Sequence, residues 1–291
     1  AAWSMAGEVT LPAYIDGEVH PSAHVTTQAT ESFTLPFRLL VTTEAVKTLQ
    51  SGGVPPVVIM GHGFFGDAGE VGSAGYRRSA NKAGAIVIGI DWWGLAKPDV
   101  GPIVSGLVAT LAPMAKMVDR LEQGLVNVVA LAALTRRPPQ AAAGVKPGFG
   151  LTDLTLPGTS IRLLQPNARL GYYGCSLGHI LGASAVALSP DIERAAVQVG
   201  GVGFGQIMSR SLPFGSMQNI LAGRFANQGE TLLALMQLAE ALAPVDPASW
   251  VEELRTTPSG MSRPVLIHAG IHDSSVPTFS AEVHARGLGL A

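Results

Sequence analysis

The sequence feature best suited to chemistry is a serine between two glycines, in the stretch GCSLG at residues 174–178. An apolar run at 168–173 precedes it, and a segment rich in alanine and leucine follows at 177–188. A strand, a sharp turn and a helix in this order form the turn that presents a serine as nucleophile, and the start of the helix suits an oxyanion. The pattern therefore predicts Ser176 as a nucleophile, although a turn in which Ser176 only caps the helix has the same residues.

A second glycine-rich turn, HGFFG at residues 62–66, follows another apolar run at 55–61. Glycine in this place lets the backbone approach a substrate, and the N–H group of Phe64, or of Phe65, would join that of Leu177 as an oxyanion donor. By itself, a His-Gly pair after a strand fits a simple turn equally well.

An acid follows in the stretch GIHDSSVP at residues 270–277, where the chain leaves an apolar run at 264–270. A carboxylate in this place, such as Asp273, can hold a histidine in the right tautomer and stabilise its charged form. The alternative is that Asp273 only closes an Asx turn or caps a helix.

The elements that would position these residues alternate between strands and helices. Short, continuous apolar runs predict strands buried on both faces, at 55–61, 85–91, 168–173, 194–200 and 264–270. Two earlier segments, 7–15 and 33–43, alternate apolar and polar residues and also predict strands. Helical patterns lie around Tyr76 and Lys82 and at 102–134, 177–188, 231–242 and 279–288. This order predicts an α/β fold with a mostly parallel sheet flanked by helices.

Two connections between predicted strands are far longer than one crossover helix requires. We therefore expect a core at 33–200 and 263–291 with a helical insertion at about 102–158, and a helical cap at 201–262. Residues 1–32 form a separate β-rich arm in this division.

Composition excludes several classes of protein. The chain has 291 residues, 47% of them hydrophobic and 14% charged, with a net charge of −2, so nothing favours nucleic acid as a partner. The longest apolar stretch, 103–118, contains Pro113 and Lys116, which argues against a transmembrane segment. No spacing of cysteine and histidine predicts a metal site, and no G-x-G-x-x-G follows the first buried strand, so no cofactor is expected.

At these residues the sequence resembles serine hydrolases of the α/β-hydrolase superfamily, in the esterase and lipase branch, over roughly 33–288. More narrowly, GYYGCSLGHILGASAVALSPDIERAAVQVGG followed by SRSLPF is similar to large, exported bacterial lipase-like hydrolases. Those proteins commonly belong to longer polypeptides. The resemblance implies an exported protein, whereas the absence of disulfides leaves the compartment open.

The resemblance also implies a histidine well beyond the acid, in a loop after one more strand. His284 is the only histidine after Asp273, and it lies inside a predicted helix, too early in the chain. His268 falls within a strand, and His272 beside the acid should point elsewhere. We therefore expect a last strand, a last helix and the catalytic histidine on polypeptide beyond Ala291.

The resulting expectation is an esterase in which Ser176 forms an acyl-enzyme, Asp273 orients the histidine, and Phe64 and Leu177 bind the oxyanion. A small-molecule or lipid-like ester would be the substrate, and the candidates for its pocket are Phe65, Trp92, Trp93, Cys175 and His179. Two alternatives stay open: an amide-cleaving enzyme of the same chemistry, and a non-catalytic binding protein that has lost the histidine.

Overall fold

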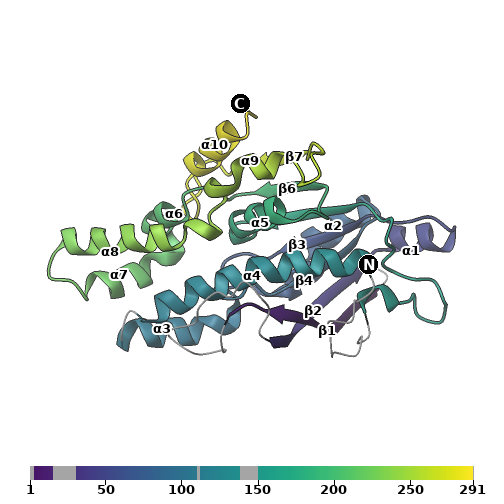
Figure 1. Ribbon diagram of the computed structural model, residues 1–291, viewed down its shortest axis with the longest axis horizontal. Coiled ribbons are helices and arrows are strands. Elements are labelled where there is room, and N and C mark those ends of the chain that lie inside the picture. The colour runs from purple at the N-terminus through teal and green to yellow at the C-terminus, as the bar shows by residue number, and fades with distance from the viewer. Residues whose placement is uncertain (1–2, 16–30, 110–111, 138–149, 291) are drawn as a thin grey trace.

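The computed structural model describes residues 3–15, 31–109, 112–137 and 150–290 (Figure 1). Its described strands form one sheet in the order β1-β2-β4-β3-β5-β6-β7. Their bounds are β1 Trp3–Ala13, β2 Glu31–Val41, β3 Val57–Gly61, β4 Ile86–Ile90, β5 Leu170–Cys175, β6 Arg194–Gln198 and β7 Val265–His268. Strands β3 to β7 run parallel, whereas β1 and β2 form an antiparallel hairpin that joins the sheet at β4. The predicted α/β fold and its mostly parallel sheet are confirmed, and β1 belongs to the same sheet as the core strands.

Helices cover the two faces of this sheet unequally. On the first face lie α4 (Ala112–Arg136), α5 (Leu177–Leu188), α9 (Val251–Arg255) and α10 (Thr278–Gly287). The second face carries α2 (Ala74–Lys82) and a 3-10 helix, Ala68–Gly72, over β3 and β4. Helix α1 (Thr43–Gln50), which the sequence did not predict, contacts α2 and begins where the Thr42 hydroxyl accepts from Ala45 N.

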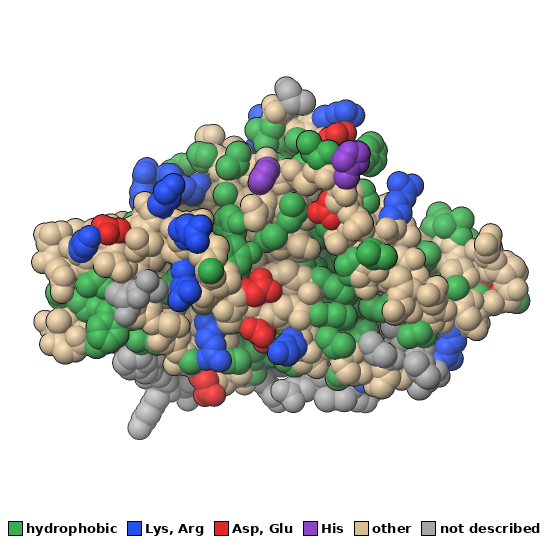
Figure 2. Space-filling model, turned by 180° about the vertical axis from the view of Figure 1, so that it is seen from behind, with side chains coloured by type: hydrophobic (Ala, Val, Ile, Leu, Met, Phe, Trp, Pro, Cys, Tyr) green, Lys and Arg blue, Asp and Glu red, His purple; other side chains and the backbone are tan. Residues whose placement is uncertain are grey.

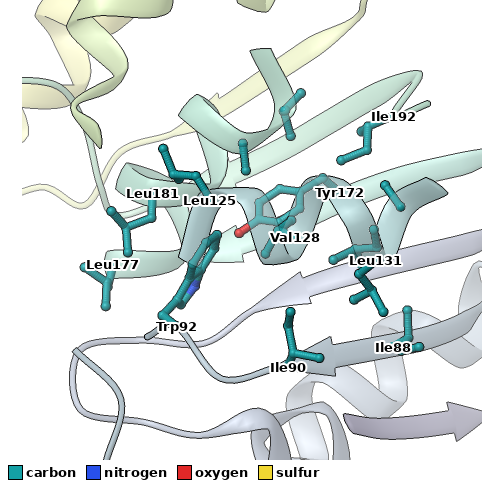
Figure 3. Packing of buried hydrophobic residues seen from close by; sticks show 14 of the residues in the cluster. Ile88, Ile90, Trp92, Leu125, Val128, Leu131, Tyr172, Leu177, Leu181 and Ile192 are labelled. Atoms are coloured by element: carbon teal, nitrogen blue, oxygen red, sulfur yellow. The ribbon is translucent and has the colours of Figure 1, made fainter. Parts of the chain in front are cut away.

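The main core lies between the sheet and the helices of the first face (Figure 3). Strand residues that point to this side, among them Ile88, Ile90 and Tyr172, meet the apolar sides of α4 and α5. In α5 the side chains are buried on every side, and Leu177 and Leu181 are completely enclosed or nearly so. This packing holds α5, the helix that follows Ser176, rigidly against β5.

Helices outside this layered core extend the molecule at one end (Figure 1). The segment predicted as one helix at 102–134 forms two, α3 (Val100–Ala109) and α4, which pack together. The predicted cap contains α6 (Phe204–Arg210), α7 (Gly215–Ala222) and α8 (Gln228–Ala241). Asp246 fixes the start of α6 by accepting from Gly203 N at 3.1 Å and from Phe204 N. No helix in the described part of the chain is long and apolar enough to cross a membrane.

Candidate active site

Ser176 lies on the turn between β5 and α5 with φ 57° and ψ −118°, a conformation that non-glycine residues rarely adopt. The flanking glycines explain how this turn closes. A Cβ atom on Gly174 would collide with the carbonyl of Gly178, and one on Gly178 would collide with the carbonyl of Gly61. Such a backbone conformation costs on the order of 1–3 kcal/mol, which the surrounding packing must offset.

Buried hydrogen bonds hold the turn from both sides. Ser176 N donates to the carbonyl of Gln198 on β6 at 2.9 Å, and the Tyr172 hydroxyl donates to the carbonyl of Gly178 at 2.6 Å. The Ser176 side chain makes no capping bond to α5. The alternative in which Ser176 serves as a helix cap therefore has no support in the geometry.

Two backbone N–H groups beside Ser176 have no hydrogen-bond partner among the described residues. Leu177 N is the first N–H of α5, so no carbonyl of the same helix can reach it. Phe64 N is also unused, whereas Phe65 N donates to the carbonyl of Leu95 at 3.0 Å. A Cβ placed on Gly63 would lie 4.0 Å from Ser176 Cβ, so this loop lies against the serine. Of the two phenylalanines considered from the sequence, only Phe64 has a free donor.

His62 shapes the loop that carries Phe64. Its Nε2 accepts from Trp92 N at 2.8 Å, so the ring proton must be on Nδ1, which lies 2.8 Å from the carbonyl of Gly63 and donates to it. The side chain is fully buried. With both nitrogens engaged, His62 positions the turn and is not available as a base.

A carboxylate that the sequence did not single out lies at the same loop. Glu70, on the 3-10 helix after the turn, accepts from Gly63 N at 3.4 Å through Oε2. Its other oxygen lies where a Cβ on Gly66 would be, so a side chain at residue 66 would displace it. Because the contact depends on the fold of residues 63–70, no short sequence pattern could have revealed it.

Asp273 closes an Asx turn, as the alternative interpretation of its sequence suggested. Its Oδ1 accepts from Ser275 N at 2.7 Å and from Val276 N at 3.1 Å. The hydrogen bonds of the described residues leave Oδ2 unused. Ser275 and Val276 line the same small cavity as Ser176, so the fold brings the acid loop to the serine.

None of the other histidines in the described part of the chain is positioned to act as the base. His179 on α5 and His284 on α10 are fully buried and bonded to each other, with Nε2 and Nδ1 3.0 Å apart. Burial lowers the pKa of His284 to about 4, and burial together with the neighbouring His284 lowers the pKa of His179. Neither ring is hydrogen-bonded to Ser176 or Asp273. His268 and His272 are exposed, and His20 and His24 lie outside the described residues.

The cavity at Ser176 measures about 20 Å³, too small for a substrate, and residues of the cap enclose it. From the core it is lined by Phe64, Leu177 and Ile180, and from the cap by Phe204, Ile207, Ser211, Pro213 and Phe214. The rings of Phe64 and Phe214 are in contact, with centroids 4.2 Å apart and planes tilted by 39°. Residues 204–214, the first part of the predicted cap, thus lie directly over the serine.

The residues predicted for a substrate pocket do not line this cavity. Trp92 is buried in the core, and Trp93 stacks on Phe33 at 4.2 Å under the guanidinium of Arg120. Phe65 stacks behind Phe64 at 3.9 Å, and His179 belongs to the buried histidine pair. The Cys175 thiol is hydrogen-bonded with the side chains of Gln198 and Tyr76, and burial raises its pKa. The cap residues that do enclose the serine were missed, because isolated apolar residues in a helical segment carry no positional signal.

No group of three or more metal-binding side chains occurs among the described residues.

No protein-family model matches the sequence, and no curated protein sequence is significantly similar to it. Solved structures do match in three dimensions. Acetyl xylan esterase 1 from Thermoanaerobacterium sp. superposes with a TM-score of 0.54 at 14% identity, over 88% of this chain and 69% of that one. The chain has the α/β-hydrolase fold.

Other similar structures come from larger enzymes. Acylaminoacyl peptidase from Pyrococcus horikoshii gives a TM-score of 0.45 at 12% identity, over 88% of this chain. Prolyl oligopeptidase B from Galerina marginata gives 0.45 at 13% identity, over 98% of this chain. This α/β-hydrolase chain spans only 33% and 31% of those two proteins, respectively.

Proposed function

We propose that the chain carries the nucleophile of a serine hydrolase that cleaves carboxylic esters. The observation that carries this proposal is the backbone of Ser176, held at φ 57° beside the unused N–H groups of Leu177 and Phe64. A serine in this conformation, facing two free donors, is arranged to bind a tetrahedral oxyanion. A turn that served only to join β5 to α5 would need neither feature.

The reaction would proceed in two steps. The Ser176 hydroxyl attacks the ester carbonyl, its proton passes to a base, and the carbonyl oxygen becomes an oxyanion held by Phe64 N and Leu177 N. Collapse of this intermediate expels the alcohol, which takes the proton from the base. Water then attacks the acyl-enzyme through the same steps and releases the acid and free Ser176.

The base would be a histidine on a further segment of polypeptide, beyond the described residues. Asp273 supports this assignment, because its Oδ2 is unused while Oδ1 fixes the turn. His62, His179 and His284 cannot serve as they stand, because each is buried and already hydrogen-bonded.

Esters are preferred over amides because they are chemically easier to cleave. Apart from Ser211 and Ser275, the side chains that line the cavity with Ser176 are apolar, which suits an acyl chain. An alkoxide also leaves more readily than an amine, which must be protonated first. Amide cleavage remains the second candidate, since solved structures of the same fold include peptidases.

A fluorophosphonate probe tests the assignment, because it reacts covalently with activated serines. We expect the natural polypeptide to be labelled once, at Ser176, and Ser176→Ala to abolish labelling. Ser211→Ala is the matched control, since Ser211 lines the same cavity and its loss should leave labelling intact. Labelling at another serine would refute the nucleophile, and a complete lack of labelling would favour the non-catalytic binding protein.

A further inference from the structure

Glu70 is carried by a rigidly held element on the second face of the sheet. It belongs to the 3-10 helix Ala68–Gly72, whose Val71 is almost completely buried in the small apolar core of that face. Ala68 N donates to Asp91 Oδ1 at 2.7 Å, which ties the helix to the loop after β4. Figure 2 shows this face, with acidic side chains near its centre among basic and apolar ones. The carboxylate of Glu70 therefore has a fixed support from which to hold a neighbouring loop.

That loop contains Gly63, which lies between two peptide groups that are each held by a partner. Gly63 N, in the peptide before it, donates to Glu70 Oε2 at 3.4 Å. The Gly63 carbonyl, in the peptide after it, accepts from His62 Nδ1 at 2.8 Å and from Gly66 N at 3.0 Å. Because glycine has no Cβ, sterics restrict its dihedral angles only weakly, so these hydrogen bonds set the conformation of Gly63.

The second of these peptide groups also contains Phe64 N, one of the two proposed oxyanion donors. A peptide is planar and trans, so its C=O and N–H groups point in opposite directions, and whatever fixes the Gly63 carbonyl also aims the Phe64 N–H. His62 and Gly66 belong to the same turn, whereas Glu70 holds Gly63 from a separate helix. Without Glu70, the peptide before Gly63 would be free to rotate, and the direction of the Phe64 N–H would be less well fixed.

The carboxylate lies close to the serine without bonding to it. A Cβ on Gly63 would lie 4.0 Å from Glu70 Oε1 and 4.0 Å from Ser176 Cβ. Among the hydrogen bonds of the described residues, none joins Glu70 to Ser176. Oε1 instead packs against Gly66, where any side chain would displace it. Glu70 can therefore act on the reaction only through the turn that it holds.

The charge of Glu70 would by itself oppose the reaction. An ionised carboxylate this close to a developing oxyanion repels it, and the repulsion is strong where water is largely excluded. An acid in this place is therefore explained only if its oxygens have another role. The hydrogen bond from Gly63 N is such a role, and it requires an acceptor oxygen but no negative charge.

We propose that Glu70 is a positioning residue for the oxyanion donor at Phe64. By accepting from Gly63 N, it holds the turn in the conformation in which the Phe64 N–H faces the oxygen that forms at Ser176. This inference deepens the proposed hydrolysis and rests on it. It also predicts that a neutral amide at residue 70 can replace the acid, because the amide oxygen can accept the same hydrogen bond.

Steady-state kinetics of the natural polypeptide with a short soluble ester test this role. Losing one oxyanion donor entirely costs about 100- to 1000-fold in kcat, so Glu70→Ala, which only loosens the donor, should lower kcat by about 10- to 100-fold and leave KM nearly unchanged. Glu70→Asp keeps the charge but shortens the reach toward Gly63, so its kcat should fall as well. Glu70→Gln should retain most of the kcat.

Asp67→Ala is the matched control for these variants. Asp67 caps the same 3-10 helix by accepting from Gly69 N at 2.8 Å, and not from Gly63 N. Its kcat should therefore stay close to that of the unaltered protein. Equal losses of kcat in Glu70→Ala and Asp67→Ala, or in Glu70→Ala and Glu70→Gln, would overturn the proposal.

A trifluoromethyl ketone separates this inference from the proposed function. Ser176 adds to its carbonyl, the serine proton passes to the base, and the ketone oxygen becomes an anion held by the same two donors. We expect its inhibition constant to rise in Glu70→Ala by the factor by which kcat falls, and to change little in Glu70→Gln. If the ketone inhibited Glu70→Ala as strongly as the unaltered protein, the positioning role would be wrong. If neither the ketone nor a fluorophosphonate reacted at Ser176 of the unaltered protein, the proposed hydrolysis would be wrong, and this inference with it.

Discussion

Gly178 illustrates how little room the turn at Ser176 leaves. A methyl group there would meet the backbone carbonyls of Gly61 and His62, neither of which can move without displacing β3. We expect Gly178→Ala to lower the free energy of unfolding by about 1–3 kcal/mol, the usual range for overpacking a well-packed site. Gly75→Ala in α2, where nothing lies within 4 Å, should instead raise it by about 0.5–1 kcal/mol. Urea unfolding of both variants measures the difference, and equal effects would refute the close approach.

The buried pair of His179 and His284 makes stability depend on pH. Burial lowers the pKa of His284 from 6.5 to about 4 and lowers that of His179 as well, so both rings are neutral in the folded protein near neutral pH. In the unfolded chain they bind protons below pH 6.5. The unfolded state therefore gains protons first, and stability should fall as the pH drops from 6.5 toward 4.

This pH dependence can be measured by urea unfolding at a series of pH values between 7 and 4.5. Each histidine contributes a slope of at most about 1.4 kcal/mol per pH unit. We expect His284→Gln to make the slope smaller, whatever it does to stability at pH 7. His268→Gln, at an exposed histidine on β7, is the control and should leave the slope unchanged. An unaltered slope in His284→Gln would contradict the buried neutral pair.

At the level of residues, sequence could predict what is local. The turn at Ser176 and the loop at Phe64 are defined by glycines within a few positions, because tight turns need residues without a Cβ. The partners of His179 and Trp93 could not be predicted, since His284 and Phe33 are distant in sequence and meet only through the fold. Trp92 resembled a pocket residue for the same reason: its position after a strand does not reveal that its side chain turns into the core.

At the level of elements, we predict that the first part of the segment 201–262, from α6 to α8, moves aside when a substrate enters. It encloses a cavity of only about 20 Å³ over Ser176, and α8 has no fully buried residue. Leu212 N donates to the carbonyl of Ser274 at 3.0 Å, which ties the cap to the acid loop. A helix without fully buried residues near a site is typical of a lid, whereas α9, at the end of the segment, packs on α5 in the core.

A reducible lock across this contact tests the lid. In a Cys175→Ser background, Leu212→Cys and Ser274→Cys place two thiols on adjoining backbones. We expect the oxidised protein to lose most of its turnover of long, water-insoluble esters. Its turnover of a short soluble ester should fall less, because only the large substrate needs the cap to be displaced. Reduction should restore both. If the lock affected both substrates equally, the segment would not be a lid.

The strands were the most predictable elements, because a run of apolar residues buried on both faces is distinctive. The helices were less so. Helix α1 was overlooked because it is short and follows β2 almost at once, and its first turn depends on the hydroxyl of Thr42. The segment at 102–134 has one continuous periodicity, which cannot reveal the division into α3 and α4.

At the level of the whole molecule, the pattern of strands and helices predicted the class of fold but not the covering of its faces. Each buried strand reads as apolar on both sides, so the sequence of β5, β6 and β7 does not say which side a helix covers. The contrast between Leu266, exposed, and Ile267, partly buried against the core, appears only in three dimensions.

The strained backbone at Ser176 also limits which substitutions the protein can accept during evolution. A domain of this kind is stable by only about 5–15 kcal/mol, and the conformation at φ 57° consumes on the order of 1–3 kcal/mol of that margin. Glycine at this position would relieve the strain and stabilise the folded protein, but it would remove the hydroxyl. Selection for the proposed nucleophile and selection for a stable protein therefore oppose each other at this position. A substitution that stabilises the core elsewhere would offset the cost of keeping the serine.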